Sequence, residues 1–312
     1  MALDVNFRVI SWAKPIHSTI IFSTPLMVEY AACQVSIAPI RAHSSEKSEM
    51  VSQLLFGETV EVQEFKDNWR RIICAWDGYS GWVDSKQLVK LTEREFQEYR
   101  QLETINISLV EGLMATDYFI PLTMGAVLPK YDGLRCALGE KTFQFSGPVV
   151  TPEQQKLGNE WIVKIARRYL NAPYLWGGRS PFGIDCSGFT QMVYKIAGVR
   201  LLRDAAQQVS QGRLIDFMEQ CQSGDLAFFD NGKGHITHVG IILPDCHIIH
   251  SSGRVRIDKL DHFGIFNRET NRYSHQLRIV KRLLPDEIET PKSVVESAKN
   301  EDELSAQSLL FS

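Results

Sequence analysis

Cys186 is the residue of this chain best placed for nucleophilic chemistry. It follows Asp185 and begins a stretch in which apolar residues recur every three or four positions up to Gly198, so the sequence predicts an amphipathic helix capped by Asp185. In the first turn of such a helix, free N–H groups and the helix dipole favour the thiolate, which is the nucleophilic form. A single cysteine at a helix start is at least as often a buried structural residue, so the assignment depends on residues further along the chain.

Two later histidines supply the groups that a cysteine nucleophile needs. His238 and His250 each lie in a short apolar stretch typical of a strand. If three residues join the two strands, Leu243 pairs with His247. Gly240 then faces His250, and His238 lies diagonally beside it on the same face, whereas a two-residue turn would separate them. The three side chains would provide a thiol, a base and a group that orients the base.

The same region offers an alternative, a metal site. It contains several residues of metal-ligand type, namely His235, His238, Cys246, His247 and His250. Residues three apart on a strand point to opposite faces, so neither His-x-x-His pair converges on one ion. The sequence therefore predicts no metal site and favours thiol chemistry, which needs no cofactor.

The chain divides into two β-rich regions and one α+β region. Alternating stretches separated by Gly, Asn and Asp turns predict a small antiparallel barrel over residues 30–91. A linker helix at 92–101 and a less regular pattern predict a second, divergent barrel up to residue 150. A capped helix from Thr151, the cysteine helix and successive antiparallel strands predict an α+β domain over 151–284. The expected strands lie at residues 33–37, 58–62, 69–74 and 81–83, then at 119–122, 125–128 and 141–145, and finally at 225–230, 238–243, 246–251 and 255–258.

The composition bears on partners and compartment. A net charge of −3 gives no electrostatic case for nucleic-acid binding, and no stretch approaches ~18 uninterrupted apolar residues, so no membrane span is predicted. Six cysteines without pair spacing, and no clean signal in the unassigned residues 1–29, predict a cytoplasmic protein. The alternative is a periplasmic or secreted protein whose N-terminal segment is an atypical signal. Residues 285–312, with seven acidic residues against two lysines, are predicted to be a disordered acidic tail.

Three motifs around these residues resemble those of NlpC-type (NlpC/p60 family) cysteine peptidases. They are Asp185-Cys186-Ser187-Gly188-Phe189, Thr237-His238-Val239-Gly240-Ile241 and Ile249-His250-Ser251-Ser252-Gly253. The resemblance covers residues 165–284 and, with the preceding barrels, is closest to the γ-D-glutamyl-L-diamino acid endopeptidases. It implies a papain-like α+β catalytic domain, with helices packed on an antiparallel sheet, preceded by two small SH3-like β-barrels. It also implies that Cys186 is the nucleophile, His238 the base and His250 its orienting partner, with Tyr174 helping to hold the oxyanion.

The resemblance also implies how the substrate is held. The free amino terminus of an L-Ala-γ-D-Glu-diamino acid peptide would be bound by Asp185, Ser187, Tyr79 and Glu49, the last two from the first barrel. A barrel in this place would close one end of the groove, so that only peptides with a free amino-terminal L-Ala fit. The alternative for Asp185 is that it only caps its helix, and for Tyr79 that it only packs in a barrel turn.

A further family motif includes Arg203 and Asp204, which are assigned to substrate binding. The chain departs from the subgroup in having Leu202 where proline is usual. The implied reaction is hydrolysis of the γ-D-glutamyl-L-diamino acid bond of murein peptides through a thioester, in cell-wall peptide recycling and without a cofactor. Two alternatives stay open: a murein-binding protein with an inactive peptidase domain, or an amidase or acyltransferase of the same superfamily.

Overall fold

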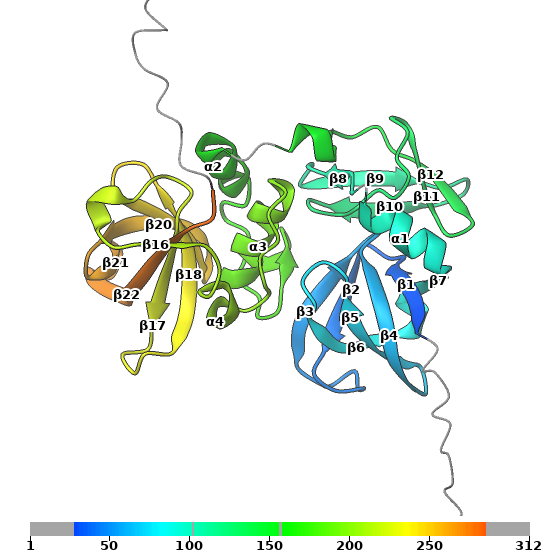
Figure 1. Cartoon of the computed structure of the whole chain (residues 1–312), viewed down its shortest axis with the longest axis horizontal. Helices are drawn as coiled ribbons and strands as arrows, with labels where there is room; N and C mark the ends of the chain where they lie inside the picture. The colour runs from blue at the N-terminus through cyan, green and yellow to red at the C-terminus, as the bar shows by residue number, and fades with distance from the viewer. Residues whose placement is uncertain (1–27, 102, 156–157, 285–312) are drawn as a thin grey trace, which may run out of the picture.

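The computed structural model describes residues 28–101, 103–155 and 158–284. The predicted acidic tail (285–312) and nearly all of the unassigned segment (1–29) therefore lie outside the described residues. The chain forms two antiparallel β-rich parts, followed by a third part in which helices accompany a sheet (Figure 1). This succession is the one predicted from the sequence.

The first part is a seven-stranded antiparallel sheet in the order β3-β2-β6-β5-β4-β1-β7. Its inward-facing residues, such as Ile40, Val60 and Ile72, are buried in one core, as period-two alternation predicts. The strand predicted at residues 33–37 is wrong, because the chain turns after Cys33 while the apolar alternation continues through the turn. The elements are β1 (Glu29–Cys33), β2 (Ile37–Arg41), β3 (Met50–Leu55), β4 (Thr59–Lys66), β5 (Trp69–Cys74), β6 (Ser80–Asp84), the 3-10 turn η1 (Ser85–Gln87) and β7 (Leu88–Leu91).

The second part begins with α1 (Glu93–Gln101), the predicted linker helix, and contains a four-stranded sheet in the order β10-β9-β12-β11. The strand predicted at 125–128 is wrong, because Gly125 has a φ of 94° and Ala126 N–H donates back to Thr123 in a turn. The strands are β8 (Ile105–Asn106), β9 (Val110–Met114), β10 (Phe119–Thr123), β11 (Arg135–Leu138), β12 (Lys141–Gln144) and β13 (Val149–Val150), which pairs with β8.

The third part contains a sheet in the order β16-β22-β17-β18-β19-β20-β21, in which β22 also pairs with β21 and closes the sheet on itself. The helix predicted from Thr151 is wrong at its start: Thr151 and Pro152 begin only a 3-10 turn, and the helix follows later. The elements are η2 (Pro152–Gln154), α2 (Asn159–Arg168), β14 (Arg179–Ser180), β15 (Gly183–Ile184), α3 (Cys186–Ile196), α4 (Ala205–Gln208), β16 (Arg213–Ile215), η3 (Met218–Gln220), β17 (Leu226–Asp230), β18 (Ile236–Leu243), β19 (His247–Ser252), β20 (Arg254–Asp261), β21 (Gly264–Asn267) and β22 (Arg272–Arg282).

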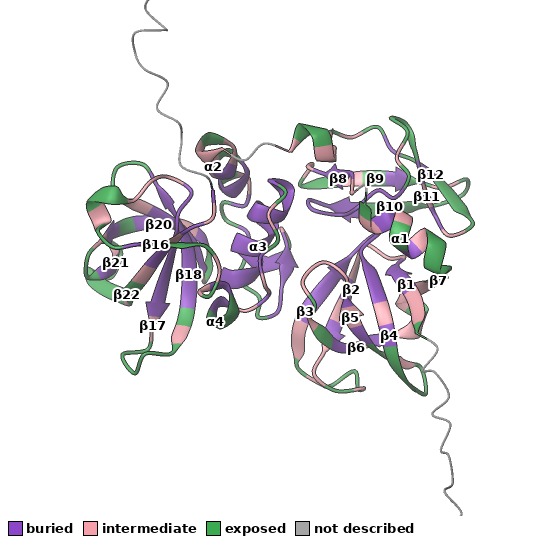
Figure 2. Ribbon diagram, in the orientation of Figure 1, coloured by how far each residue is buried: buried purple, intermediate pink, exposed green. Residues whose placement is uncertain are grey.

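Helix α3 is the element at which the parts meet. It contacts β18 and β19 of the third sheet and the short strand β14, which in turn contacts β3 of the first sheet. Every residue of α3 is buried, as the purple ribbon of Figure 2 shows. A single hydrophobic core joins residues of all three parts, including Phe56, Phe143 and Phe189. The helix that carries the candidate nucleophile is therefore packed between the three parts of the chain.

Candidate active site

The position of Cys186 is set by the start of α3. Asp185 has an extended backbone, and its Oδ1 accepts the Gly188 N–H at 2.6 Å, so the predicted cap is confirmed. Gly188 leaves room for the turn before the helix, because an added Cβ would lie 2.3 Å from the carbonyl oxygen of Gly178. The chain therefore holds Cys186 as the first residue of a tightly packed helix.

The thiol of Cys186 does not have the electrostatics that its place on the helix predicts. Burial, followed by the nearby Asp185 carboxylate, raises its pKa to about 12. The backbone N–H groups of Val239 and Ser187 lower the pKa, but by less. The predicted preference for the thiolate is wrong for the resting site, because removing the sulfur from water outweighs the donors of the first turn. A base is needed to take the proton.

The hairpin β18–β19 brings the two predicted histidines to one face. Leu243 pairs with His247 across the three-residue connection 244–246, and Gly240 pairs with His250. The predicted register is therefore confirmed. Gly240 makes the approach possible, since an added Cβ would lie 2.8 Å from the Cβ of His250.

His238 and His250 form a buried pair next to the cysteine. His238 Nε2 lies 2.8 Å from His250 Nδ1, and the two side chains are almost fully buried. Burial, followed by the neighbouring His250 and His275, lowers the pKa of His238 well below its usual value. His238 is therefore neutral at neutral pH and able to accept a proton. The backbone N–H of Val239, the residue after His238, is directed at the Cys186 sulfur. The His238 imidazole therefore lies on β18, the strand that packs against α3 and its thiol.

Three groups of the site were not predicted. Asp258 of β20 lies with its Oδ2 3.0 Å from His250 Nε2, and Arg256 binds the same carboxylate. His275 of β22 stacks on His238, with ring centroids 4.1 Å apart and 24° between the planes. The signal for Asp258 was present, because it lies in a stretch predicted as a strand. The strand of His275 was not predicted, so nothing in the sequence placed it here.

The three imidazoles fit a metal ion poorly. One nitrogen of each of His238, His250 and His275 lies within 4.8 Å of the others. However, the nearly parallel rings of His238 and His275 direct their lone pairs along parallel planes rather than towards one point. The 2.8 Å contact between His238 and His250 leaves no space for an ion between them. The arrangement suits hydrogen bonding and proton transfer.

Cys186 opens into a cavity of about 510 Å³ whose walls come from the first and third parts of the chain. Trp176, which lines the cavity, donates from Nε1 to Glu49 Oε1 at 2.7 Å and so joins the two walls. Five of the predicted substrate-binding residues line this cavity: Glu49, Tyr79, Asp185, Ser187 and Asp204. The structure thus brings together residues more than a hundred positions apart.

Arg203 is the predicted binding residue that the structure places elsewhere. It is 1% exposed and does not line the cavity. Its guanidinium donates to both oxygens of Asp185, at 3.0 and 2.6 Å, and to Ser187 Oγ at 3.0 Å. Its Nε donates to Ser52 of β3 at 2.9 Å. Four of its five N–H donors are used in these contacts and Arg203 does not line the cavity, so the structure places it to hold Asp185 and Ser187 rather than to touch a substrate.

Tyr174, the predicted oxyanion residue, is exposed and lies near the cysteine. Burial, followed by the nearby Cys186, raises the pKa of its hydroxyl to about 12, so the hydroxyl is a donor at neutral pH. Its backbone N–H is fixed to Gly253 O at 3.0 Å. The structure therefore places a hydroxyl donor near the sulfur, in keeping with the predicted role.

Comparison with known proteins agrees with this geometry. Residues 171–273 match the NlpC/P60 family, and residues 40–88 match the bacterial dipeptidyl-peptidase Sh3 domain. A gamma-D-glutamyl-L-lysine dipeptidyl-peptidase of Bacillus subtilis is 32% identical over 213 residues, which cover 64% of this chain and 71% of that protein. The chain belongs to the NlpC/P60 family. A protein of the same name from Bacillus cereus is 30% identical over 233 residues, 65% of this chain and 68% of that protein.

A solved structure shows the fold of this NlpC/P60 protein. The crystal structure of an NlpC/P60 family protein from Bacillus cereus matches with a TM-score of 0.71 and 24% identity, and covers 82% of this chain and 100% of that one. The comparisons confirm the predicted NlpC-type domain and one SH3-like domain, whereas the second barrel stays a prediction. Family and relatives together support a hydrolase that acts on peptidoglycan peptides.

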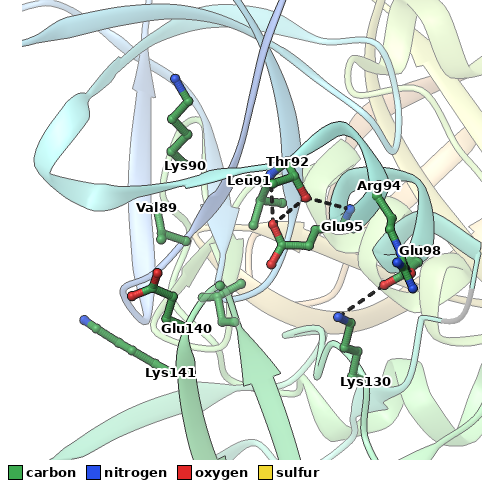
Figure 3. A pocket seen from close by; sticks show the side chains of 12 residues that line it. Val89, Lys90, Leu91, Thr92, Arg94, Glu95, Glu98, Lys130, Glu140 and Lys141 are labelled. Atoms are coloured by element: carbon green, nitrogen blue, oxygen red, sulfur yellow. Dashed lines mark hydrogen bonds and ion pairs between the residues drawn. The ribbon is translucent and has the colours of Figure 1, made fainter.

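A larger cavity, of about 790 Å³, lies away from the cysteine, between β7, α1 and the β11–β12 hairpin (Figure 3). Among its charged side chains, Glu98 pairs with Arg94 and Lys130. None of its described lining residues is a cysteine or histidine. This cavity therefore offers no thiol or imidazole comparable to those at the Cys186 cavity. In the part of the chain that the structure describes, no helix has the length and apolar character needed to span a membrane.

Proposed function

We propose that this NlpC/P60 protein is a cysteine endopeptidase that hydrolyses the γ-D-glutamyl-L-diamino acid bond of murein peptides with a free amino-terminal L-Ala, in cell-wall peptide recycling. One observation carries the proposal: Cys186 opens into a cavity that the SH3-like domain lines with Glu49 and Tyr79. The relatives named gamma-D-glutamyl-L-lysine dipeptidyl-peptidase support the substrate class.

The geometry supports a general-base mechanism. His238 takes the thiol proton while the Cys186 sulfur attacks the γ-glutamyl carbonyl carbon. The resulting oxyanion is stabilised by the Cys186 backbone N–H at the start of α3 and by the Tyr174 hydroxyl. The C–N bond breaks as His238 returns the proton to the amine of the diamino acid, which leaves a thioester. His238 then takes a proton from water, whose oxygen attacks the thioester carbon. The C–S bond breaks, L-Ala-γ-D-Glu leaves as the acid, and His238 gives the proton to the sulfur, which restores the free thiol.

The charges around the cavity support recognition of an ammonium group. Arg203 neutralises Asp185, so Glu49 and Asp204 are the cavity acids whose charge is left for the substrate. Burial raises the pKa of Asp204 above its usual value, although Arg203 opposes the rise. A bound ammonium would favour the ionised form of this carboxyl. The amino terminus of L-Ala would thus meet carboxylates at the end of the cavity that the SH3-like domain closes.

The catalytic assignment is tested with L-Ala-γ-D-Glu-diaminopimelate as substrate. We expect Cys186→Ala and His238→Ala to abolish release of L-Ala-γ-D-Glu without unfolding the protein, and His250→Ala, which only misorients the base, to leave a measurable rate. Cys246→Ala, which removes an exposed cysteine, serves as the matched control and should retain full activity. Equal activity in the wild type and Cys186→Ala would reject the thiol mechanism.

The recognition of the amino terminus is tested with an acetylated peptide. Loss of a desolvated ion pair costs about 2–5 kcal/mol, so acetylation should nearly abolish turnover. Glu49→Gln and Asp204→Asn should weaken cleavage of the free peptide and leave the slow cleavage of the acetylated one unchanged. If Asp185→Asn slows both peptides equally, Asp185 acts as a cap and not as an ammonium ligand. Comparable rates on free and acetylated peptides would contradict this specificity.

The proposed compartment is the cytoplasm. All six cysteines lie in the described residues and are free thiols, and a reducing compartment is where such thiols persist. Cell fractionation with an antibody against the protein tests this assignment. Recovery from an extracytoplasmic fraction would contradict it.

A further inference from the structure

Three buried side chains on adjacent strands form a hydrogen-bonded line. In the β18–β19 register Gly240 faces His250, which places His238 diagonally beside it. In the β19–β20 register Ile248 faces Asp258, so Asp258 lies diagonally on the other side of His250. The distances are 2.8 Å from His238 Nε2 to His250 Nδ1 and 3.0 Å from His250 Nε2 to Asp258 Oδ2. Each of the three side chains is nearly inaccessible to solvent, so the partners of these nitrogens are the neighbouring side chains.

Asp258 is held as a carboxylate. Arg256 Nη2 donates to its Oδ1 at 2.9 Å, and Arg256 Nε lies 2.7 Å from its Oδ2. Burial raises the pKa of Asp258, but the hydrogen bonds from His250 and Arg256 outweigh it and lower the pKa below the usual value. Glu269 binds the other side of the guanidinium at 3.1 Å and helps to fix it. An ionised carboxylate has no proton to donate, so Asp258 only accepts hydrogen bonds.

This acceptor determines where the protons of the imidazoles lie. His250 must carry its proton on Nε2 to donate to Asp258, and burial lowers its pKa, so it is neutral. A neutral imidazole has one N–H, which leaves His250 Nδ1 as an acceptor. The short contact then requires His238 to donate from Nε2. The lone pair of His238 is thereby placed on Nδ1.

We propose that Asp258 is a positioning residue that sets the protons on both imidazoles and makes Nδ1 of His238 the atom that accepts the Cys186 proton. The inference rests on the proposed role of His238 as the base. Without Asp258, His250 is free to carry its proton on Nδ1 and to donate it to His238 Nε2. The proton of His238 then lies on Nδ1, and that nitrogen cannot take a proton from the thiol. Asp258 does not line the cavity, so its loss should slow the reaction without weakening substrate binding.

The proton positions are measured directly by long-range 1H–15N NMR on the full chain with labelled histidine. His238 and His250 are assigned among the eight histidines by their substitution with glutamine. In the wild type we expect Nε2 of both rings to be protonated and Nδ1 of both to be bare. In Asp258→Leu we expect a substantial share of His238 to carry its proton on Nδ1. A wild-type His238 protonated on Nδ1 overturns the proposal without any variant, and so does an Asp258→Leu spectrum unchanged from the wild type.

Steady-state kinetics give the second readout. We expect Asp258→Leu to lower kcat by roughly 10- to 100-fold, as the loss of an outer partner of an active-site histidine does, with KM near its wild-type value. Asp261→Leu is the matched control: Asp261 lies on the same strand, but its carboxylate binds Tyr273, so kcat should not change. If Asp258→Leu does not fold, Asp258→Asn replaces it. Its amide can turn either its oxygen or its nitrogen to His250, and a mixed His238 signal with a reduced kcat is expected.

The outcomes separate this inference from the proposed function. A folded Asp258 variant with wild-type kcat, beside an inactive Cys186→Ala, overturns the role of Asp258 and leaves the cysteine mechanism standing. An active Cys186→Ala rejects the cysteine mechanism itself. A kcat loss shared equally by Asp261→Leu would also overturn the proposal, since the effect would then not be specific to the imidazole line.

Discussion

Glu58 should be the residue on which the attachment of the SH3-like domain depends most. It lies in the turn between β3 and β4 and is buried, and both of its charged partners belong to the NlpC/P60 domain. Arg179 donates to both carboxylate oxygens, at 2.8 and 2.9 Å, and Lys195 of α3 donates to Oε1 at 2.6 Å. Glu58→Gln removes the charge with almost no change of shape, and leaves two cations buried without their anion.

The magnitude follows from the pKa of this carboxyl. Burial alone would raise it, but Arg179 and Lys195 outweigh burial and lower the pKa of Glu58 from 4.5 to about 2. At 1.36 kcal/mol per pH unit, this difference corresponds to roughly 3 kcal/mol of stability, within the ~3–5 kcal/mol expected for breaking a buried ion pair. Because the folded pKa lies below the unfolded one, this stability is present above pH 4.5 and is lost as the pH falls towards 2.

Urea unfolding of the full chain measures the effect. At neutral pH, Glu58→Gln should lower the free energy of unfolding by about 3 kcal/mol. Glu64→Gln on β4 is the matched control, because its partner Arg71 is exposed and such pairs contribute about 0–1 kcal/mol. The difference between wild type and Glu58→Gln should shrink as the pH falls below 4.5, and Lys195→Met added to Glu58→Gln should restore part of the loss. A loss no larger than that of Glu64→Gln, or one independent of pH, would refute the reasoning.

Three further predictions concern the active site. The pKa of the buried Cys186 is raised to about 12, so the absorbance spectra of the wild type and Cys186→Ala should differ by no thiolate band at neutral pH. A clear thiolate band in the difference spectrum would contradict the general-base mechanism. His275→Ala should lower kcat roughly 2- to 10-fold, because the stacked rings of His275 and His238 contribute about 0.5–1.5 kcal/mol. His275→Phe keeps the stack and should retain most of the rate. Equal losses in the two variants would exclude a role for stacking. Arg203→Lys should reduce kcat/KM by roughly tenfold or more. The factor should be the same for free and acetylated peptides, because Arg203 holds Asp185 and not the substrate. A loss confined to the free peptide would show that Arg203 binds the substrate directly.

The parts of the site that depend on neighbouring residues in the sequence could be predicted. Asp185 was identified as a cap because capping depends on residues within one turn of the helix. The pairing of Gly240 with His250 could be deduced because a hairpin's register follows from the length of its connection. The same reasoning would have found Asp258: Gly253, with a φ of 70°, marks the tight turn into β20, and counting from it places Asp258 opposite Ile248.

Properties set by tertiary burial could not be predicted. The thiol of Cys186 has the helix position that favours a thiolate, but its pKa is raised because the whole of α3 is enclosed, and no local pattern reports that enclosure. Glu58 and Lys195 are 137 positions apart, and each alone is typical of an exposed charge. Arg203 was identified from a motif, yet its guanidinium is buried and binds Asp185 and Ser187, which line the cavity, without lining the cavity itself.

Two sets of buried charges couple the position of Cys186, the proposed nucleophile, to the SH3-like domain that lines the cavity. At its start, α3 is tied to the SH3-like domain through Asp185, Arg203 and Ser52; towards its end, it is tied to the same domain through Lys195 and Glu58. The SH3-like domain therefore cannot shift without moving the sulfur as well. Because that domain also supplies one wall of the cavity, the acids that would bind the peptide's amino terminus and the thiol that would attack its γ-glutamyl carbonyl stay at a fixed separation. A fixed separation selects peptides by length from their free end, which is the selectivity that the proposed function requires.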